Sequence, residues 1–267
     1  MDDLKKIFEH TDDAPPATPA ATLVIFRNAP DGGAPQILMV QRSKEMRFAG
    51  GAAVFPGGRV DDADRALAEA HGATDEEAIH ELAARIAAVR ETLEETGLVV
   101  GLHQQIDLET ARRARARLLE TGELAPVLEE MGWTLDLDAM VPFARWRPKH
   151  REIRVFDTRF YLANLGTGAV ELLVDSTENT HLFWASAEEA LGLAETGEIK
   201  VIFPTRRNLE RLAQFGSFDE AVAHVQEFPS RMITPSMEIR DGEPWLVIPH
   251  DAGYPVDGEK LDTAARG

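Results

Sequence analysis

The sequence predicts an α/β protein, a three-layer α/β/α sandwich with a mixed sheet, helical insertions and a C-terminal extension. Segments with strand-like alternation and segments with helical periodicity follow one another along the chain, and no internal repeat is present. The clearest element is a long helix that starts at Thr74 or Asp75 and ends before Gly97. Its buried face consists of apolar residues spaced three or four apart: Leu82, Ile86, Val89 and Leu93.

The other elements are expected in a regular order. A Pro-rich leader over residues 1–20 precedes strands at 22–27, 36–41 and 52–55. Next to the long helix we expect a strand at 98–102 and helices at 61–71, 108–120 and 123–131. The second half predicts strands at 140–146, 154–163 and 180–184, then helices at 186–195, 206–215 and 218–226. Ser186 and Thr205 are the expected N-caps of two of these helices.

These elements divide the chain into a leader, one domain and a tail. The domain covers residues 21–230 and contains two insertions, at about 59–81 and about 107–131. Residues 231–267 form a strand pair that turns at Asp241-Gly242, followed by the tail.

Composition predicts a water-soluble enzyme. The 267 residues are 44% hydrophobic, and no stretch reaches the roughly 18 apolar residues of a membrane helix. There is no cysteine, which excludes disulfides and thiolate chemistry. The first residues lack the basic start of a secretory signal, and the last four are no peroxisomal address, so we expect a cytoplasmic protein without a membrane partner.

The charge pattern indicates an anionic small molecule as partner. A net charge of −18 argues against binding to nucleic acid, which needs clustered cations. Locally, however, basic residues gather before the Gly-Gly turn at 57–58 and again over residues 145–154. Both clusters are candidates for phosphate contact, whereas the four arginines between 112 and 117 predict a solvated helix surface.

Three carboxylates stand on one face of the long helix. Glu91, Glu94 and Glu95 are at positions i, i+3 and i+4, where like charges repel each other unless a cation lies between them. Hard divalent ions take oxygen ligands and share them with substrate phosphates. The preceding Pro-Gly-Gly turn can bring a backbone carbonyl close to such an ion, so Gly57 completes the predicted ligand set.

At these residues the sequence resembles the Nudix hydrolases. Their signature is a Gly, five residues, Glu, seven residues, Arg-Glu, two residues, Glu-Glu, one residue and Gly. Gly58 matches its start, and the end is matched by Arg90, Glu91, Glu94, Glu95 and Gly97. From Gly58 to Arg90 there are 90 − 58 = 32 positions, where the signature has 14, so about 18 residues are inserted. The residue eight before Arg90 is Leu82 in place of the signature Glu, and Glu81 is one position away.

The resemblance implies Mg²⁺- or Mn²⁺-dependent hydrolysis of a diphosphate. Glu91, Glu94, Glu95 and Gly57 would bind the metal, and Arg90 would hold carboxylates of the helix in place. The general base stays open between Glu91 and Glu94 within the box and Glu178 outside it. The insertion either shields the site or takes part in a dimer contact, and a homodimer is left open.

A split box of this kind is similar to the coenzyme A diphosphatase branch of the family. The upstream motif of that branch is matched in register by Arg42, Ser43, Arg47, Gly51 and Phe55. The resemblance implies cleavage of coenzyme A or acyl-coenzyme A to 3′,5′-ADP and 4′-phosphopantetheine or its acyl form. Its expected contacts with substrate come from Arg42, Ser43, Arg47, Gly58 and Arg147. Two alternatives stay open: a pyrophosphatase for ADP-ribose, dinucleotides or nucleotide sugars, and a ligand-sensing Nudix module without catalysis.

Overall fold

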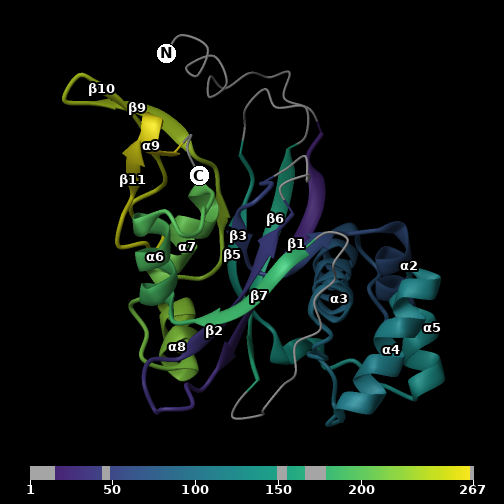
Figure 1. Ribbon diagram of the computed structural model, residues 1–267. Helices are drawn as coiled ribbons and strands as arrows, with labels where there is room; N and C mark the ends of the chain where they lie inside the picture. Colours follow the sequence, from purple (N-terminus) through teal and green to yellow (C-terminus); the bar gives the residue numbers. More distant parts are fainter. Residues whose placement is uncertain (1–15, 44–48, 149–154, 166–178, 265–267) are drawn as a thin grey trace.

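The computed structural model describes residues 16–43, 49–148, 155–165 and 179–264. Figure 1 shows a twisted sheet with helices on both sides, as the predicted α/β/α sandwich requires. Helices α2 to α5 lie on one side, and helices α6 to α8 lie on the other. In the described part of the chain, no helix is long and apolar enough to cross a membrane.

The mixed sheet is organised around β1. This strand, Thr18–Arg27, is parallel to β6, Phe156–Asn164, and antiparallel to β2, Gln36–Arg42, and to β4, Gly57–Arg59. The strand order is β3-β2-β1-β6-β5-β8, with β7 on β2 and β4 on β1. The remaining strands are β3, Ala53–Val54, β5, Val141–Trp146, β7, Asn179–Ala185, and β8, Met232–Ile233. Because β1 extends over nine pairs with β6, it begins four residues earlier than predicted.

One side of the sheet carries the long helix and the inserted helices. The long helix is α3, Glu76–Thr96, and α2, α4 and α5 pack near it. Helix α2 covers Asp62–Ala70, α4 covers Leu108–Thr121 and α5 covers Leu124–Met131. A 3-10 turn follows at Leu137–Ala139. On the other side lie α6, Ala187–Thr196, α7, Phe203–Leu212, and α8, Phe218–Glu227. The C-terminal part adds β9, Ser236–Arg240, β10, Glu243–Val247, β11, Gly258–Lys260, and α9, Leu261–Ala264.

Both ends of α3 follow from local sequence. The Asp75 side chain accepts a hydrogen bond of 2.9 Å from the Ala78 N–H, as an N-cap does. Gly97 ends the helix in the left-handed conformation with φ at 74°. The predicted start and end of this helix are therefore confirmed.

Two local predictions are wrong. Residues 98–102 form no strand, because the chain leaves α3 through the Gly97 turn and only Leu102 makes an isolated bridge, to Leu135. Thr205 is no N-cap: α7 already begins at Phe203, with Pro204 in its first turn, where the missing N–H of proline costs no helix bond. The Asp241-Gly242 turn between β9 and β10 is confirmed, with φ at 51° and 81°.

The Ser186 capping box is also confirmed and yields a stability prediction. Ser186 Oγ accepts from the Glu189 N–H at 3.1 Å, and the Glu189 carboxylate accepts from the Ser186 N–H at 2.7 Å. Replacing Ser186 by Ala leaves a helix donor without a partner and should lower the free energy of unfolding by about 1 kcal/mol. Thermal or urea unfolding measures this, and Ser186→Thr, which keeps the acceptor, should retain most of the stability.

Candidate active site

The Gly-Gly turn lies directly against the glutamate helix. Gly57 has φ at 154°, and a Cβ at this position would be 2.3 Å from the Ala21 carbonyl oxygen, so only glycine fits between β4 and β1. A Cβ on Gly58 would be 2.3 Å from the Glu91 carboxyl carbon. The absence of a side chain at Gly58 is therefore what allows Glu91 to reach the turn.

Glu95 contacts the same turn from the next position on the helix face. The Gly57 N–H donates a hydrogen bond of 2.9 Å to Glu95 Oε2, and Glu95 is 4% exposed. The Glu94 side chain is more open, at 34% exposure. Two of the three predicted glutamates thus lie against the Gly57-Gly58 backbone, and the third faces outward beside them.

Arg90 connects this helix to the turn and to α2. Its Nε and Nη2 donate to the two oxygens of Asp64 at 3.0 and 2.9 Å, a bidentate pair in which both residues are buried. Nη2 also donates to the Arg59 carbonyl at 2.8 Å, and Nη1 donates to Glu91 Oε1 at 2.9 Å. The guanidinium therefore holds α2, β4 and α3 in one arrangement.

Asp64 is the residue that our reading of the sequence missed. We looked for the first carboxylate of the signature by counting back from Arg90, which gives Leu82. Counting forward from Gly58 gives 58 + 6 = 64, an aspartate where the signature has glutamate. The distance from Asp64 to Arg90 is 90 − 64 = 26 positions against 8 in the signature, so the same 18 residues are inserted after Asp64.

Glu81, the neighbour of Leu82, has a different partner set. It accepts hydrogen bonds from Tyr161 Oη at 3.0 Å, from Arg159 Nε at 3.1 Å and from Arg85 Nε at 3.2 Å. These contacts fasten the first half of α3 to β6. Glu81 therefore anchors the helix on the sheet and does not take the place of the signature carboxylate.

The electrostatics of Glu91 suit a cation site. The pKa of Glu91 is raised to about 7, mainly because the carboxyl group is desolvated; Arg90 lowers this pKa, and the charges of Glu94 and Asp64 raise it. A carboxylate in this environment gains from a nearby positive charge. In the described part of the chain, no three His, Cys, Asp or Glu side chains converge on one point. Glu91 and Glu95 instead turn toward Arg90 and the Gly57 N–H.

The donor set nevertheless fits a hard divalent ion. Carboxylate and carbonyl oxygens are the ligands that Mg²⁺ and Mn²⁺ take in proteins. The lack of a side chain at Gly58 lets the Glu91 carboxylate lie directly against the turn.

Some of the predicted substrate residues lie in the described part of the chain, and others lie outside it. Arg42 ends β2, and its Nε is buried with no hydrogen-bond partner in the described residues. The Ser43 carbonyl accepts from the Gly51 N–H at 3.2 Å, which closes the segment that leads to β3. Arg47 and Glu178 lie outside the described residues, so their roles remain predictions.

Arg147 lies at the same end of the sheet as the Gly-Gly turn, but on another strand. It directly follows β5, where its N–H donates to the Ile233 carbonyl at 2.9 Å. Between β5 and β4 lie β6 and β1, so the in-sheet separation is three strand spacings, about 14 Å. Its neighbour Arg145 is occupied by a bidentate pair with Asp157, with both contacts at 2.7 Å. Only an extended substrate would contact both the turn and Arg147.

Comparisons with known proteins agree with this geometry. A model of the NUDIX domain matches residues 17–118, which contain β1, the Gly-Gly turn, α2 and α3. Residues 17–118 of the chain are therefore a Nudix domain. It is 26% identical to acyl-coenzyme A diphosphatase NUDT19 of Gallus gallus over 312 aligned positions, which cover 91% of this chain and 82% of that protein. It also superposes on the crystal structure of a NUDIX hydrolase from Alicyclobacillus acidocaldarius with a TM-score of 0.68 at 27% identity, covering 78% of this chain and 96% of the other.

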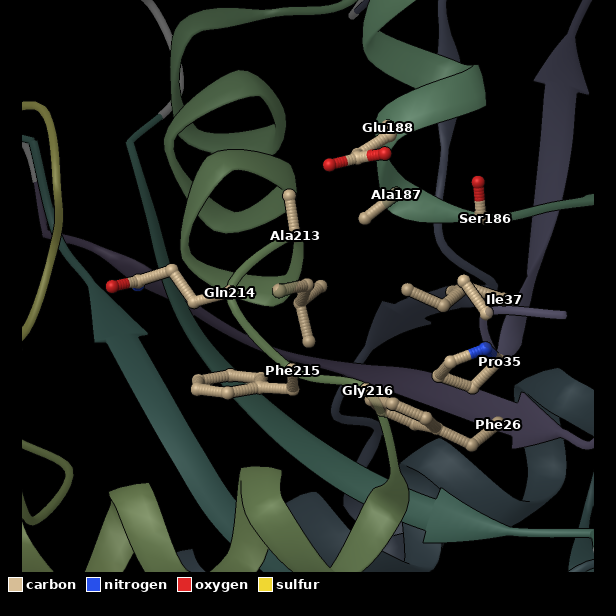
Figure 2. Close-up of a pocket in the computed structure, with 12 residues that line it drawn as sticks. Phe26, Pro35, Ile37, Ser186, Ala187, Glu188, Ala213, Gln214, Phe215 and Gly216 are labelled. Atoms are coloured by element: carbon tan, nitrogen blue, oxygen red, sulfur yellow. The ribbon is translucent and has the colours of Figure 1, made fainter.

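A separate pocket of about 160 Å³ opens on the other side of the Nudix sheet (Figure 2). Phe26, Pro35 and Ile37 form one wall, and the start of α6 and the end of α7 form the other. Its lining contains one carboxylate, from Glu188, and no cationic side chain. The pocket therefore lacks the groups that a diphosphate needs, and the glutamate helix remains the candidate site.

Gly58→Ala should abolish activity and leave the protein folded. The new methyl group would overlap the Glu91 carboxylate, and Arg90 resists its displacement. We expect a loss of at least about 100-fold in kcat/KM, since such a displacement misplaces a catalytic group by about 1 Å. Gly192→Ala on α6 is the matched control, because a Cβ there meets nothing within 4 Å. Full activity of Gly58→Ala would contradict this arrangement.

Asp64→Asn should weaken both folding and catalysis, because it removes the charge that compensates buried Arg90. We expect about 2 kcal/mol less unfolding free energy, the usual value for a hydrogen bond to a charged group. Asp62→Asn, an exposed position on the same helix, should change the unfolding free energy by less than about 0.5 kcal/mol. Urea unfolding compares the two, and equal stability of both variants would show that the Arg90–Asp64 pair contributes nothing.

Proposed function

We propose that this protein hydrolyses the pyrophosphate of coenzyme A or acyl-coenzyme A to 3′,5′-ADP and 4′-phosphopantetheine or its acyl form. The observation that carries the proposal is the contact of Glu91 and Glu95 with the Gly57-Gly58 turn. It brings the two ends of the Nudix signature together although about 18 residues separate them beyond the usual spacing. The Nudix family hydrolyses such linkages, and the chicken relative is named as an acyl-coenzyme A diphosphatase.

The upstream segment supports a coenzyme A substrate. Arg42 and Ser43 end β2, and the chain then runs through Gly51 and β3 into Phe55 and the Gly-Gly turn. Coenzyme A carries a 3′-phosphate in addition to its pyrophosphate, and a guanidinium is the usual bidentate partner of a phosphate. Arg42, at the end of β2, is our candidate for such a contact.

In the proposed mechanism a water oxygen attacks one phosphorus, and the bond from that phosphorus to the bridging oxygen breaks. Mg²⁺ or Mn²⁺, when bound, neutralises charge on the pyrophosphate and makes water more acidic. The residues that would hold it are Glu91, Glu94, Glu95 and the Gly57 carbonyl. Arg90 donates to the Glu91 carboxylate and is itself held by Asp64, so it keeps Glu91 in place.

A carboxylate must take the proton of the attacking water. Within the box, Glu91 has a pKa raised to about 7 by burial, close to the value at which a general base works best. Glu94 has the more exposed side chain, which gives water access to it. Glu178 outside the box stays the third candidate. A pH profile of kcat in Glu94→Gln and Glu178→Gln separates them, because loss of the base removes the acidic limb.

The test is product analysis with a panel of diphosphates in the presence of Mg²⁺: coenzyme A, acetyl-coenzyme A, NADH, ADP-ribose and UDP-glucose. We expect release of 3′,5′-ADP from the first two, and a loss of about 10³-fold or more in Glu94→Gln, since a metal-site carboxylate is removed. Glu188→Gln, in the pocket on the other side of the sheet, is the control and should keep full activity. Cleavage of ADP-ribose or UDP-glucose alone would show that coenzyme A is not the substrate. Binding without any cleavage would favour a ligand-sensing module.

A further inference from the structure

An arginine from the second insertion reaches the last turn of the glutamate helix. Arg115 Nε donates a hydrogen bond of 2.8 Å to the backbone carbonyl of Glu94, which lies 21 positions earlier in the chain. The last four carbonyls of a helix have no donor within the helix itself. Gly97 bonds to the Leu93 carbonyl at 3.0 Å, so the carbonyl of Glu94 needs a donor from another element.

The packing of α4 fixes where this guanidinium lies. Ala111, Ala114 and Leu118 form its buried face, and the last two share a core cluster with α3. The helix begins at the Asp107 cap, whose side chain accepts from the Thr110 N–H at 2.8 Å. Arg115 follows Ala114 at the edge of this face and is half-buried. A cation at a helix C-terminus is also favoured by the helix dipole.

We infer that Arg115 is a positioning residue for the metal-binding glutamates, an inference that rests on the proposed function. Glu91 and Glu95 are held at their carboxylates, by Arg90 and by the Gly57 N–H. The Glu94 carboxylate lies 3.9 Å from Arg90 Nη1, at the outer limit of an ion pair. Arg115 holds the backbone from which the Glu94 side chain projects, so it acts on Glu94 through the main chain.

The consequence is that the second insertion takes part in catalysis without touching substrate. If the Glu94 carbonyl loses its donor, the last turn of α3 can fray, and Glu94 and Glu95 move with it. The effect should be on metal affinity first, because two predicted ligands lie in this turn. At saturating metal, kcat should recover and the KM for the diphosphate should stay unchanged.

Binding of Mn²⁺ without substrate tests the inference on the full chain. Arg115→Met keeps the apolar stem and removes the donor, and we expect Mn²⁺ affinity to fall about 10-fold, the lower end for residues that support metal ligands. Arg115→Lys keeps a charged donor and should restore most of the affinity. Titration calorimetry or Mn²⁺ electron paramagnetic resonance gives the affinity, and amide exchange at residues 93–97 reports fraying of the turn.

Two control variants separate positioning from general stability. Arg113→Met removes an exposed arginine from the same helix and should leave Mn²⁺ affinity unchanged. Leu118→Val lowers the stability of α4 packing but keeps Arg115, so it should lower Tm without changing Mn²⁺ affinity.

The outcomes distinguish this inference from the proposed function. The inference is supported if Arg115→Met binds Mn²⁺ more weakly, Arg115→Lys restores the affinity, and both control variants keep the wild-type affinity. Unchanged affinity in Arg115→Met, or an equal loss in Leu118→Val, overturns it while the wild-type metal site stands. A wild-type protein that binds no Mn²⁺ overturns the metal site itself, and this inference with it.

Discussion

The buried pair of Arg90 and Asp64 is the interaction on which the rest of the site depends. Burying two charges costs several kcal/mol per ion unless each finds hydrogen-bond partners. Here both Asp64 oxygens accept from Arg90, and the remaining N–H groups of the guanidinium reach the Arg59 carbonyl and Glu91. One guanidinium thus joins the inserted helix α2, the strand of the Gly-Gly turn and the glutamate helix. Removing Asp64 would leave Arg90 Nε without its acceptor, and removing Arg90 would leave the buried Asp64 carboxylate without its cation.

This fixed pair explains how the helix tolerates a crowded set of carboxylates. Glu91, Glu94 and Glu95 destabilise the helix by mutual repulsion, and Glu91 also loses its hydration on burial. The Arg90 guanidinium donates to Glu91 and the Gly57 N–H donates to Glu95, and these bonds hold the two carboxylates in place. A divalent cation bound at this site would relieve the repulsion between the carboxylates.

Local patterns in the sequence predicted the elements well, and long-range contacts explain what they missed. The glutamate helix was predictable because apolar periodicity, Asp75 and Gly97 all specify it within one segment. Asp64 could have been found by counting forward from Gly58, but its role depends on contact with Arg90 across the insertion. Nothing in the sequence distinguishes Arg115 from the neighbouring arginines, because its partner is a backbone carbonyl. The strand expected at 98–102 failed since apolar residues there pack against the core without a strand to pair with.

The first insertion packs within the same outer layer as the second. Its helix α2 packs on α3 and contacts α5 of the second insertion, while its predicted roles as a shield or a dimer contact stay predictions. Four small residues of α3, Ala83, Ala84, Ala87 and Ala88, are fully buried. The two insertions therefore form one outer helical layer over the glutamate helix. Each supplies one polar contact to it, Asp64 to the Arg90 side chain and Arg115 to the Glu94 backbone, so the layer supports the candidate site.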